Sequence, residues 1–83
     1  MKPEIIFNDS AFKHGVTESD IRKILVEFLF EGAFEDDSGK FLIIGFDIKG
    51  TLVEIMYNIK ADNTVNVFHA MKCRKEFVKL IER

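Results

Sequence analysis

The chain has 83 residues, of which 47% are hydrophobic and 31% are charged, with one cysteine and a formal net charge of −2. This length fits one folded domain, because two separate cores would each be too small to offset the entropy of the chain. The composition excludes a disordered chain, and no apolar run approaches the ~20 residues that cross a bilayer. The N-terminus has no secretory signal and Cys73 cannot form an internal disulfide, so we expect a single cytoplasmic domain over residues 1–83, with no membrane partner.

Charge is distributed unevenly along the chain. Residues 1–37 carry four lysine or arginine residues against nine acids, whereas residues 71–83 carry five against two. A basic C-terminal end favours phosphate binding through its local field, even in an acidic protein. The alternative is that these cations only favour the C-terminal end of a helix, and the sequence leaves both interpretations open.

The first predicted elements are short. Residues 4–7 form a brief apolar segment between Pro3 and an Asn-Asp pair, which predicts either a short strand or an extended lead-in to the next element. Residues 9–14 predict a single helical turn that ends at Gly15, because glycine most easily adopts the left-handed conformation that closes a helix.

A longer helix follows this turn. Thr17 stands in the position of a helix N-cap, and Asp20 comes three residues later, as the acid of a capping box does. Apolar residues then recur at helical spacing on one face. This pattern predicts a helix over residues 18–30 that ends at Gly32.

The second half of the chain reads as strands joined by turns. The predicted strands are residues 33–35, 40–46, 51–57 and 64–69, with turn compositions between them at residues 36–39, 47–50 and 60–63. Alternation along the last strand places Asn66 and His69 on opposite faces of the sheet. From residue 71 or 72 onward the apolar spacing predicts a C-terminal helix. The predicted fold class is α+β, with an antiparallel meander of three to four strands flanked by an N-terminal and a C-terminal helix.

We expect no metal and no cofactor. The histidines and the cysteine lack paired-ligand spacing, and no glycine-rich phosphate loop is present. Cys73 as a nucleophile would need His69 as its base, but a structural cysteine on the apolar helix face is the favoured interpretation.

Two basic clusters remain as candidates for chemistry: Lys13 with His14, and His69 with Lys72, Arg74 and Lys75. Such clusters suit cleavage of an RNA phosphodiester, where a base takes the 2′-hydroxyl proton, an acid protonates the leaving oxygen and cations stabilise the phosphorane. Because imidazole titrates near neutrality, His14 and His69 are the candidate catalytic residues. We expect both on one side of the molecule, within reach of one phosphate. The alternatives are a solvated histidine beside a glycine and a solvated basic helix face.

Three segments resemble the BrnT-type toxins, in the same order along the chain. Residues 12–21, FKHGVTESDI, resemble the KHGV-x-x-x-(D/E) opening of that family, and residues 50–57, GTLVEIMY, resemble its GRLL-x-V-x-Y strand. Residues 67–75, VFHAMKCRK, resemble its I-I-S-A-R-K-A-T-R segment. The chain also resembles a group of uncharacterised bacterial proteins with KHGV…DI near the start and IHAM-x-x-R near the end.

The BrnT resemblance implies a compact fold akin to the RelE-type ribonucleases and a toxin of a type II toxin-antitoxin system. It further implies metal-independent cleavage of an RNA substrate and neutralisation by a cognate antitoxin protein. By position, Lys13 and His14 match the Lys-His pair of the family and Lys72 matches the basic residue of its closing motif. Together with Arg74 and Lys75, these lysines are the expected RNA phosphate-binding residues.

The chain also departs from this family. The arginine that follows the alanine in the closing motif is Met71 here, the small polar residue before the alanine is His69, and the pI is near 5.6. Loss of the arginine requires Arg74 or Lys75 to replace it, whereas His69 adds a proton-transfer group.

Two other functions stay open. One is a non-catalytic interaction module of the same fold that binds a protein partner or a second copy of itself, which the acidic pI and the missing arginine favour. The other is a small structural or regulatory domain in which His14 belongs to a helix stop and His69 is a hydrogen-bonded junction residue.

Overall fold

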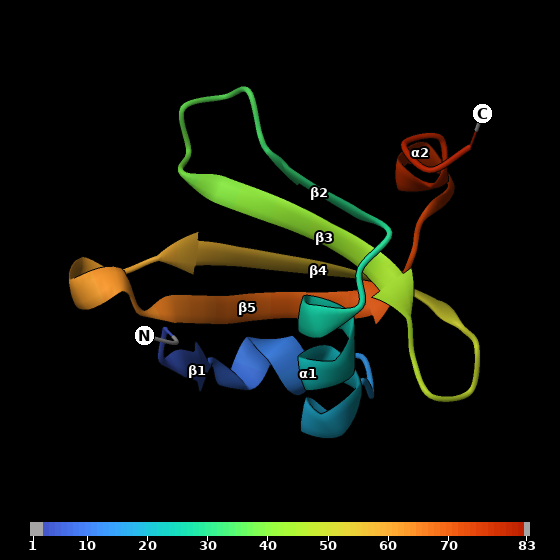
Figure 1. The fold of residues 1–83 in the computed structure, drawn as a ribbon, viewed down its shortest axis with the longest axis horizontal. Helices are drawn as coiled ribbons and strands as arrows, with labels where there is room; N and C mark the ends of the chain where they lie inside the picture. Colours follow the sequence, from blue (N-terminus) through green and yellow to red (C-terminus); the bar gives the residue numbers. More distant parts are fainter. Residues whose placement is uncertain (1–2, 83) are drawn as a thin grey trace.

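The computed structural model describes residues 3–82, which form one five-stranded sheet and four short helices (Figure 1). The strands are β1 (Ile5–Phe7), β2 (Phe30–Ala33), β3 (Lys40–Phe46), β4 (Leu52–Ile59) and β5 (Val65–Lys72). The α-helices are α1 (Glu18–Val26) and α2 (Lys75–Val78), and the 3-10 helices are η1 (Asp9–Phe12) and η2 (Ala61–Asn63). In Figure 1, α1 (teal) and α2 (red) lie on different sides of β3.

The sheet is mixed, with strand order β1-β5-β4-β3-β2. Strands β2 to β5 form the predicted antiparallel meander, but β1 adds a fifth strand that runs parallel to β5. The prediction of three to four purely antiparallel strands is therefore wrong. The backbone amide of Val65 donates to the carbonyl of Glu4 at an N–O distance of 2.8 Å, and the amide of Asn8 donates to the carbonyl of Val67 at 2.9 Å. A strand of three residues carries too little periodicity to predict a partner some sixty residues away.

Helix α1 begins as predicted, because Thr17 Oγ1 accepts a hydrogen bond from the amide of Asp20 at 3.2 Å. It ends at Val26 rather than at residue 30, which corrects the predicted end. The amide of Leu29 donates to the carbonyl of Ile44 at 2.8 Å, so the backbone at this point is hydrogen-bonded to β3 and no longer within the helix. Strand β2 consequently starts earlier than the predicted residues 33–35.

The C-terminal segment also differs from its prediction. Strand β5 continues to Lys72, and the amide of Cys73 still donates to the carbonyl of Leu52 at 2.9 Å, so no helix begins at residue 71 or 72. The C-terminal helix is the single turn α2, whose Phe77 ring packs edge-on against Phe34 at a centroid distance of 6.4 Å. Within residues 3–82, no helix is long and apolar enough to cross a membrane.

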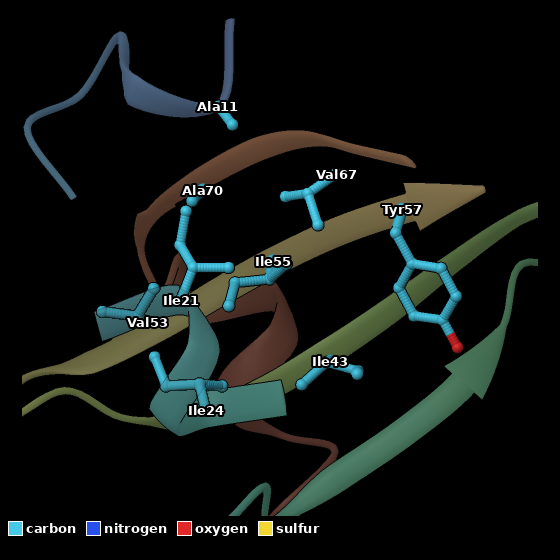
Figure 2. Close-up of a cluster of buried hydrophobic side chains, with 9 residues drawn as sticks. All are labelled: Ala11, Ile21, Ile24, Ile43, Val53, Ile55, Tyr57, Val67 and Ala70. Carbon is cyan, nitrogen blue, oxygen red and sulfur yellow. The ribbon is translucent and has the colours of Figure 1, made fainter. Parts of the chain in front are cut away.

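The core lies between α1 and one face of the sheet (Figure 2). Its buried members are Ala11, Ile21, Ile24, Ile43, Val53, Ile55, Tyr57, Val67 and Ala70. Helix α1 contributes two isoleucines and the three central strands contribute most of the others. Full burial of one such aliphatic side chain is worth about 1.5–3 kcal/mol, so this face supplies most of the apolar stabilisation.

A β-bulge interrupts the pairing of β4 with β5. Met56 pairs with His69 and Asn58 pairs with Asn66, which leaves Phe68 as an extra residue on β5. Because Met56 and Asn58 share one face, Asn66 and His69 also share it, and the prediction of opposite faces is wrong. The bulge adds one residue to the alternation on which that prediction depended.

Candidate functional site

A carboxylate is buried on the sheet face opposite α1. Glu54 lies in the middle of β4 and is fully buried, with an exposed fraction of 0%. Its neighbours Val53 and Ile55 both belong to the core beneath α1. Because successive strand residues point to opposite faces, Glu54 must point to the other face of the sheet.

Two side chains from the end of β5 and the segment after it hold this carboxylate. His69 Nε2 lies 2.9 Å from Glu54 Oε2. Arg74 donates from its backbone amide to Oε1 at 2.9 Å, from Nη2 to Oε2 at 2.6 Å, and from Nε to both oxygens at 3.1 Å. Every oxygen of Glu54 thus accepts at least two hydrogen bonds, as a buried charge requires.

The electrostatics of this cluster keep Glu54 ionised. Burial works to raise the pKa of Glu54, but hydrogen bonds from Arg74 and His69 outweigh it and lower that pKa below its ordinary value. The same hydrogen bonds to Glu54 raise the pKa of Arg74. At neutral pH the two form a charged, hydrogen-bonded pair, with the Glu54 side chain at 0% and the Arg74 side chain at 41% exposure.

The two histidines lie side by side. The ring centroids of His14 and His69 are 5.9 Å apart, with an angle of 70° between the ring planes, so their expected proximity is confirmed. His14 is brought there by η1, which Ser10 anchors by donating from Oγ to the carbonyl of Phe68 at 2.6 Å. Gly15 then turns the chain into α1 with φ of 84°, a conformation that side chains rarely adopt.

A pocket of about 270 Å³ adjoins His14. It lies between the start of α1, the β3–β4 connection and the end of β5, and Lys49 and Lys72 both line it. Its two acids have backbone partners: Asp20 accepts from the amide of Ile48, and Asp47 accepts from two amides of its own turn. The pocket therefore combines two lysines and an imidazole with two aspartates that accept backbone hydrogen bonds, and its formal charge is balanced.

The predicted site residues occupy different places around this pair of histidines. Lys72 lines the pocket, whereas Arg74 contacts Glu54 and stacks over Phe77 at 5.2 Å from the ring centroid. Lys13, which precedes His14, and Lys75, which follows Arg74, are both exposed. The contacts thus bring His14 beside His69, and the pocket brings His14 beside Lys72. Lys72 pairs with Val53 and so lies on the α1 face of the sheet, opposite to the face of His69.

Sequence reasoning missed Glu54 and Lys49. Glu54 had a usable signal, because it is a single acid in the apolar stretch of residues 52–57. An acid inside a strand of a small sheet either faces solvent or needs buried partners. Lys49 had no signal beyond its turn, since its position beside Lys72 depends on how the β3–β4 connection folds back.

Cys73 is a poor nucleophile in this structure. Burial, followed by the nearby charge of Glu54, raises the pKa of its thiol, which disfavours the reactive thiolate. Across residues 3–82, no three histidine, cysteine or acidic side chains gather in a way that could hold a metal ion.

No family model matches this sequence, and no curated protein matches it either. Among solved structures, the fold is similar to the crystal structure of the Brucella abortus ribonuclease toxin, BrnT. The TM-score is 0.61 at 15% identity, and the match covers 89% of this chain and 100% of that one. The chain is thus an α+β domain with a BrnT-like fold, which confirms the predicted fold at this level.

Proposed function

We propose that this chain is the toxin-like component of a type II toxin-antitoxin system and a metal-independent endoribonuclease. His14 and His69 are its acid–base pair, and Lys13, Lys72, Arg74 and Lys75 are its RNA phosphate contacts. The observation that carries this proposal is the 5.9 Å separation of the two imidazole centroids, which come from segments 55 positions apart in the sequence. The shared fold with a ribonuclease toxin supports it.

The proposed reaction is a transfer within one RNA strand. One imidazole accepts the 2′-hydroxyl proton, the 2′-oxygen bonds to phosphorus, and the bond from phosphorus to the 5′-oxygen breaks. The other imidazole, in its protonated form, donates its proton to that leaving oxygen. The products are a 2′,3′-cyclic phosphate and a 5′-hydroxyl, and proton exchange with water restores both histidines.

Cations near the histidines would stabilise the crowded phosphorane. Lys72 lines the pocket beside His14, and Lys49 lines the same pocket. The ammonium groups of these lysines support phosphate binding, although Asp20 and Asp47 of the same pocket balance their formal charge. A cognate antitoxin protein is the expected partner that silences the activity.

The test is tightly induced expression in a bacterial host, with growth and total RNA followed over time. We expect growth arrest and RNA loss with the wild type, and relief with the double variant His14→Ala, Lys72→Ala. The matched control is Lys60→Ala, Lys79→Ala, which also removes exposed side chains and should stay toxic.

Purified protein sharpens this test. Removal of one proton-transfer group costs on the order of 10²–10⁴-fold in rate, so His69→Ala should slow cleavage of a short RNA by that factor. Equal cleavage by His69→Ala and the wild type would remove His69 from the acid–base pair.

A non-catalytic interaction module is the second candidate, and exposed apolar side chains favour it. Val26, Leu29 and Ile48 are 79%, 53% and 69% exposed, near the end of α1 and in the β3–β4 connection. Healthy growth with intact RNA would favour this candidate, and sedimentation would then show whether a second copy is the partner.

A further inference from the structure

We propose that Glu54 is a positioning residue that holds His69 in the tautomer protonated at Nε2, so that Nδ1 is the atom that accepts the substrate proton. His69 is then the general base and His14 the general acid. This assignment rests on the proposed function, whereas the tautomer itself is a property of the protein that can be measured without any substrate.

The contact with Glu54 determines the tautomer. An ionised carboxylate only accepts hydrogen bonds, so the 2.9 Å contact between His69 Nε2 and Glu54 Oε2 requires a proton on Nε2. In a neutral imidazole the other nitrogen, Nδ1, then carries a free lone pair. Among residues 3–82, no hydrogen bond to Nδ1 of His69 competes for that lone pair.

Arg74 keeps the carboxylate in place for this role. Its guanidinium and its backbone amide together engage both oxygens of Glu54, at distances of 2.6–3.1 Å. The backbone bond matters because it does not depend on the side-chain rotamer of Arg74. Glu54 is therefore held by both the backbone and the side chain of Arg74, and His69 is a further contact of Oε2.

Differences in exposure support a positioning role. The Glu54 side chain is 0% exposed and that of His69 is 21% exposed, so substrate can reach the imidazole but not the carboxylate. A carboxylate that cannot touch substrate acts on the chemistry only through the ring that it orients. If the cluster only stabilised the fold, Arg74 alone would satisfy the charge and the tautomer of His69 would have no consequence.

The first experiment is nitrogen NMR of the full chain with ¹⁵N-labelled histidine, at a pH where His69 is neutral. We expect the wild type to show a protonated Nε2 and an unprotonated Nδ1. In Glu54→Gln, the amide oxygen is drawn to the donors of Arg74 and its NH₂ group faces His69, so the proton should move to Nδ1. A wild-type ring protonated mainly at Nδ1 would overturn the proposal.

Two further variants keep this experiment decisive. Glu54→Met, Arg74→Leu removes both charges together, so no unpaired charge threatens folding, and the preference for a protonated Nε2 should vanish. An unchanged preference there would also overturn the proposal. Glu31→Gln alters the other carboxylate that contacts β4, through Tyr57, and should leave the His69 signals as in the wild type.

Kinetic measurements then test the positioning role of Glu54 separately from the proposed ribonuclease activity of the chain. With rates normalised to the folded fraction, Glu54→Gln should lower kcat for a short RNA on the order of 10²–10⁴-fold with little change in KM, as expected for a base held in the wrong tautomer. An unchanged kcat would overturn the positioning role while leaving the ribonuclease standing. A wild type with the expected tautomer but no cleavage would refute the ribonuclease and leave the tautomer assignment intact.

Discussion

The two faces of the sheet are made from alternate residues of the same strands, yet they are buried in different ways. Toward α1, β4 contributes Val53 and Ile55, which are 2% and 0% exposed and pack against other apolar side chains. Away from α1, β4 contributes Glu54, which is equally buried but satisfied by Arg74 and His69. The Glu54 face also buries Leu42 and Ile44 of β3, because Ile44 pairs with Glu54 and Leu42 with Met56. The difference between the faces is therefore that one of them buries a hydrogen-bonded carboxylate among its apolar side chains.

This difference separates stability from specificity. An apolar side chain gains from burial in almost any well-packed surroundings, whereas a buried carboxylate is tolerated only where donors with the right geometry meet it. The larger apolar cluster of the α1 face should therefore contribute most to the stability of the domain. The cluster of Glu54, Arg74 and His69 should determine how one histidine is oriented, at little net gain in stability.

The largest expected effect breaks the apolar face. Ile55→Ala should lower the free energy of unfolding by about 2–5 kcal/mol, because it leaves a cavity in a fully buried position. Urea denaturation measures this loss, with Ile48→Ala as the control. Ile48 is 69% exposed, and its change should stay within about 0.5 kcal/mol. Equal losses in the two variants would contradict the assignment of the core.

The next effect concerns the polar face and depends on pH. The pKa of Glu54 is lower in the folded protein than in the unfolded chain, so its stabilisation is complete above the ordinary glutamate pKa of about 4.3 and is lost as the pH falls through the folded pKa. Glu54→Gln should lack this acid-dependent loss. At neutral pH this substitution should lower the free energy of unfolding by roughly 1–3 kcal/mol. That is less than the loss expected when one partner is removed from a fully buried ion pair, because Arg74 stays partly solvated.

Urea unfolding of both proteins from pH 7 down to pH 3 tests this. The quantity to compare is the difference in free energy between wild type and Glu54→Gln, since other carboxylates titrate in both. A difference that stays constant across this range would mean that Glu54 is not held as a stabilised carboxylate.

The smallest expected effect concerns the hydrogen bond between Tyr57 and Glu31. Tyr57 donates from its hydroxyl to Glu31 Oε2 at 2.5 Å, and Tyr57→Phe should cost about 1 kcal/mol, because the exposed Glu31 regains water. Burial, and then Glu31, raises the pKa of Tyr57, so this stabilisation is present below the ordinary tyrosine pKa of about 10 and is lost as pH rises through the folded value. Thermal unfolding of the wild type and of Tyr57→Phe at neutral and alkaline pH would measure the loss of stability and its dependence on pH. The tautomer of His69 should be the same in the two proteins.

Local signals predicted the beginning of α1 well and its end poorly. The cap of α1 at Thr17 and the turn at Gly15 were correct, because both depend on neighbours within a few residues. The end of α1 was wrong because the apolar residues after Val26 fit a helix face and a strand equally well. Only pairing with β3 decides between them.

The candidate site divides in the same way. The types of residue that suit RNA cleavage were visible in the sequence, and so was the expectation that His14 and His69 lie together. The catalytic roles of these residues stay a prediction. The partners of His69 could not be predicted, because the bulge at Phe68 sets the face on which it lies.

By itself, the sequence determined the α+β class, the cap of α1, the meander and the chemical groups near the proposed site, since these follow from local preference and periodicity. Tertiary structure alone decided that β1 joins β5, that α1 stops at Val26, and that Glu54 meets Arg74 and His69. The physical reason is that these outcomes are competitions among backbone and side-chain partners far apart in the chain. Such competitions are decided only once the segments have packed together.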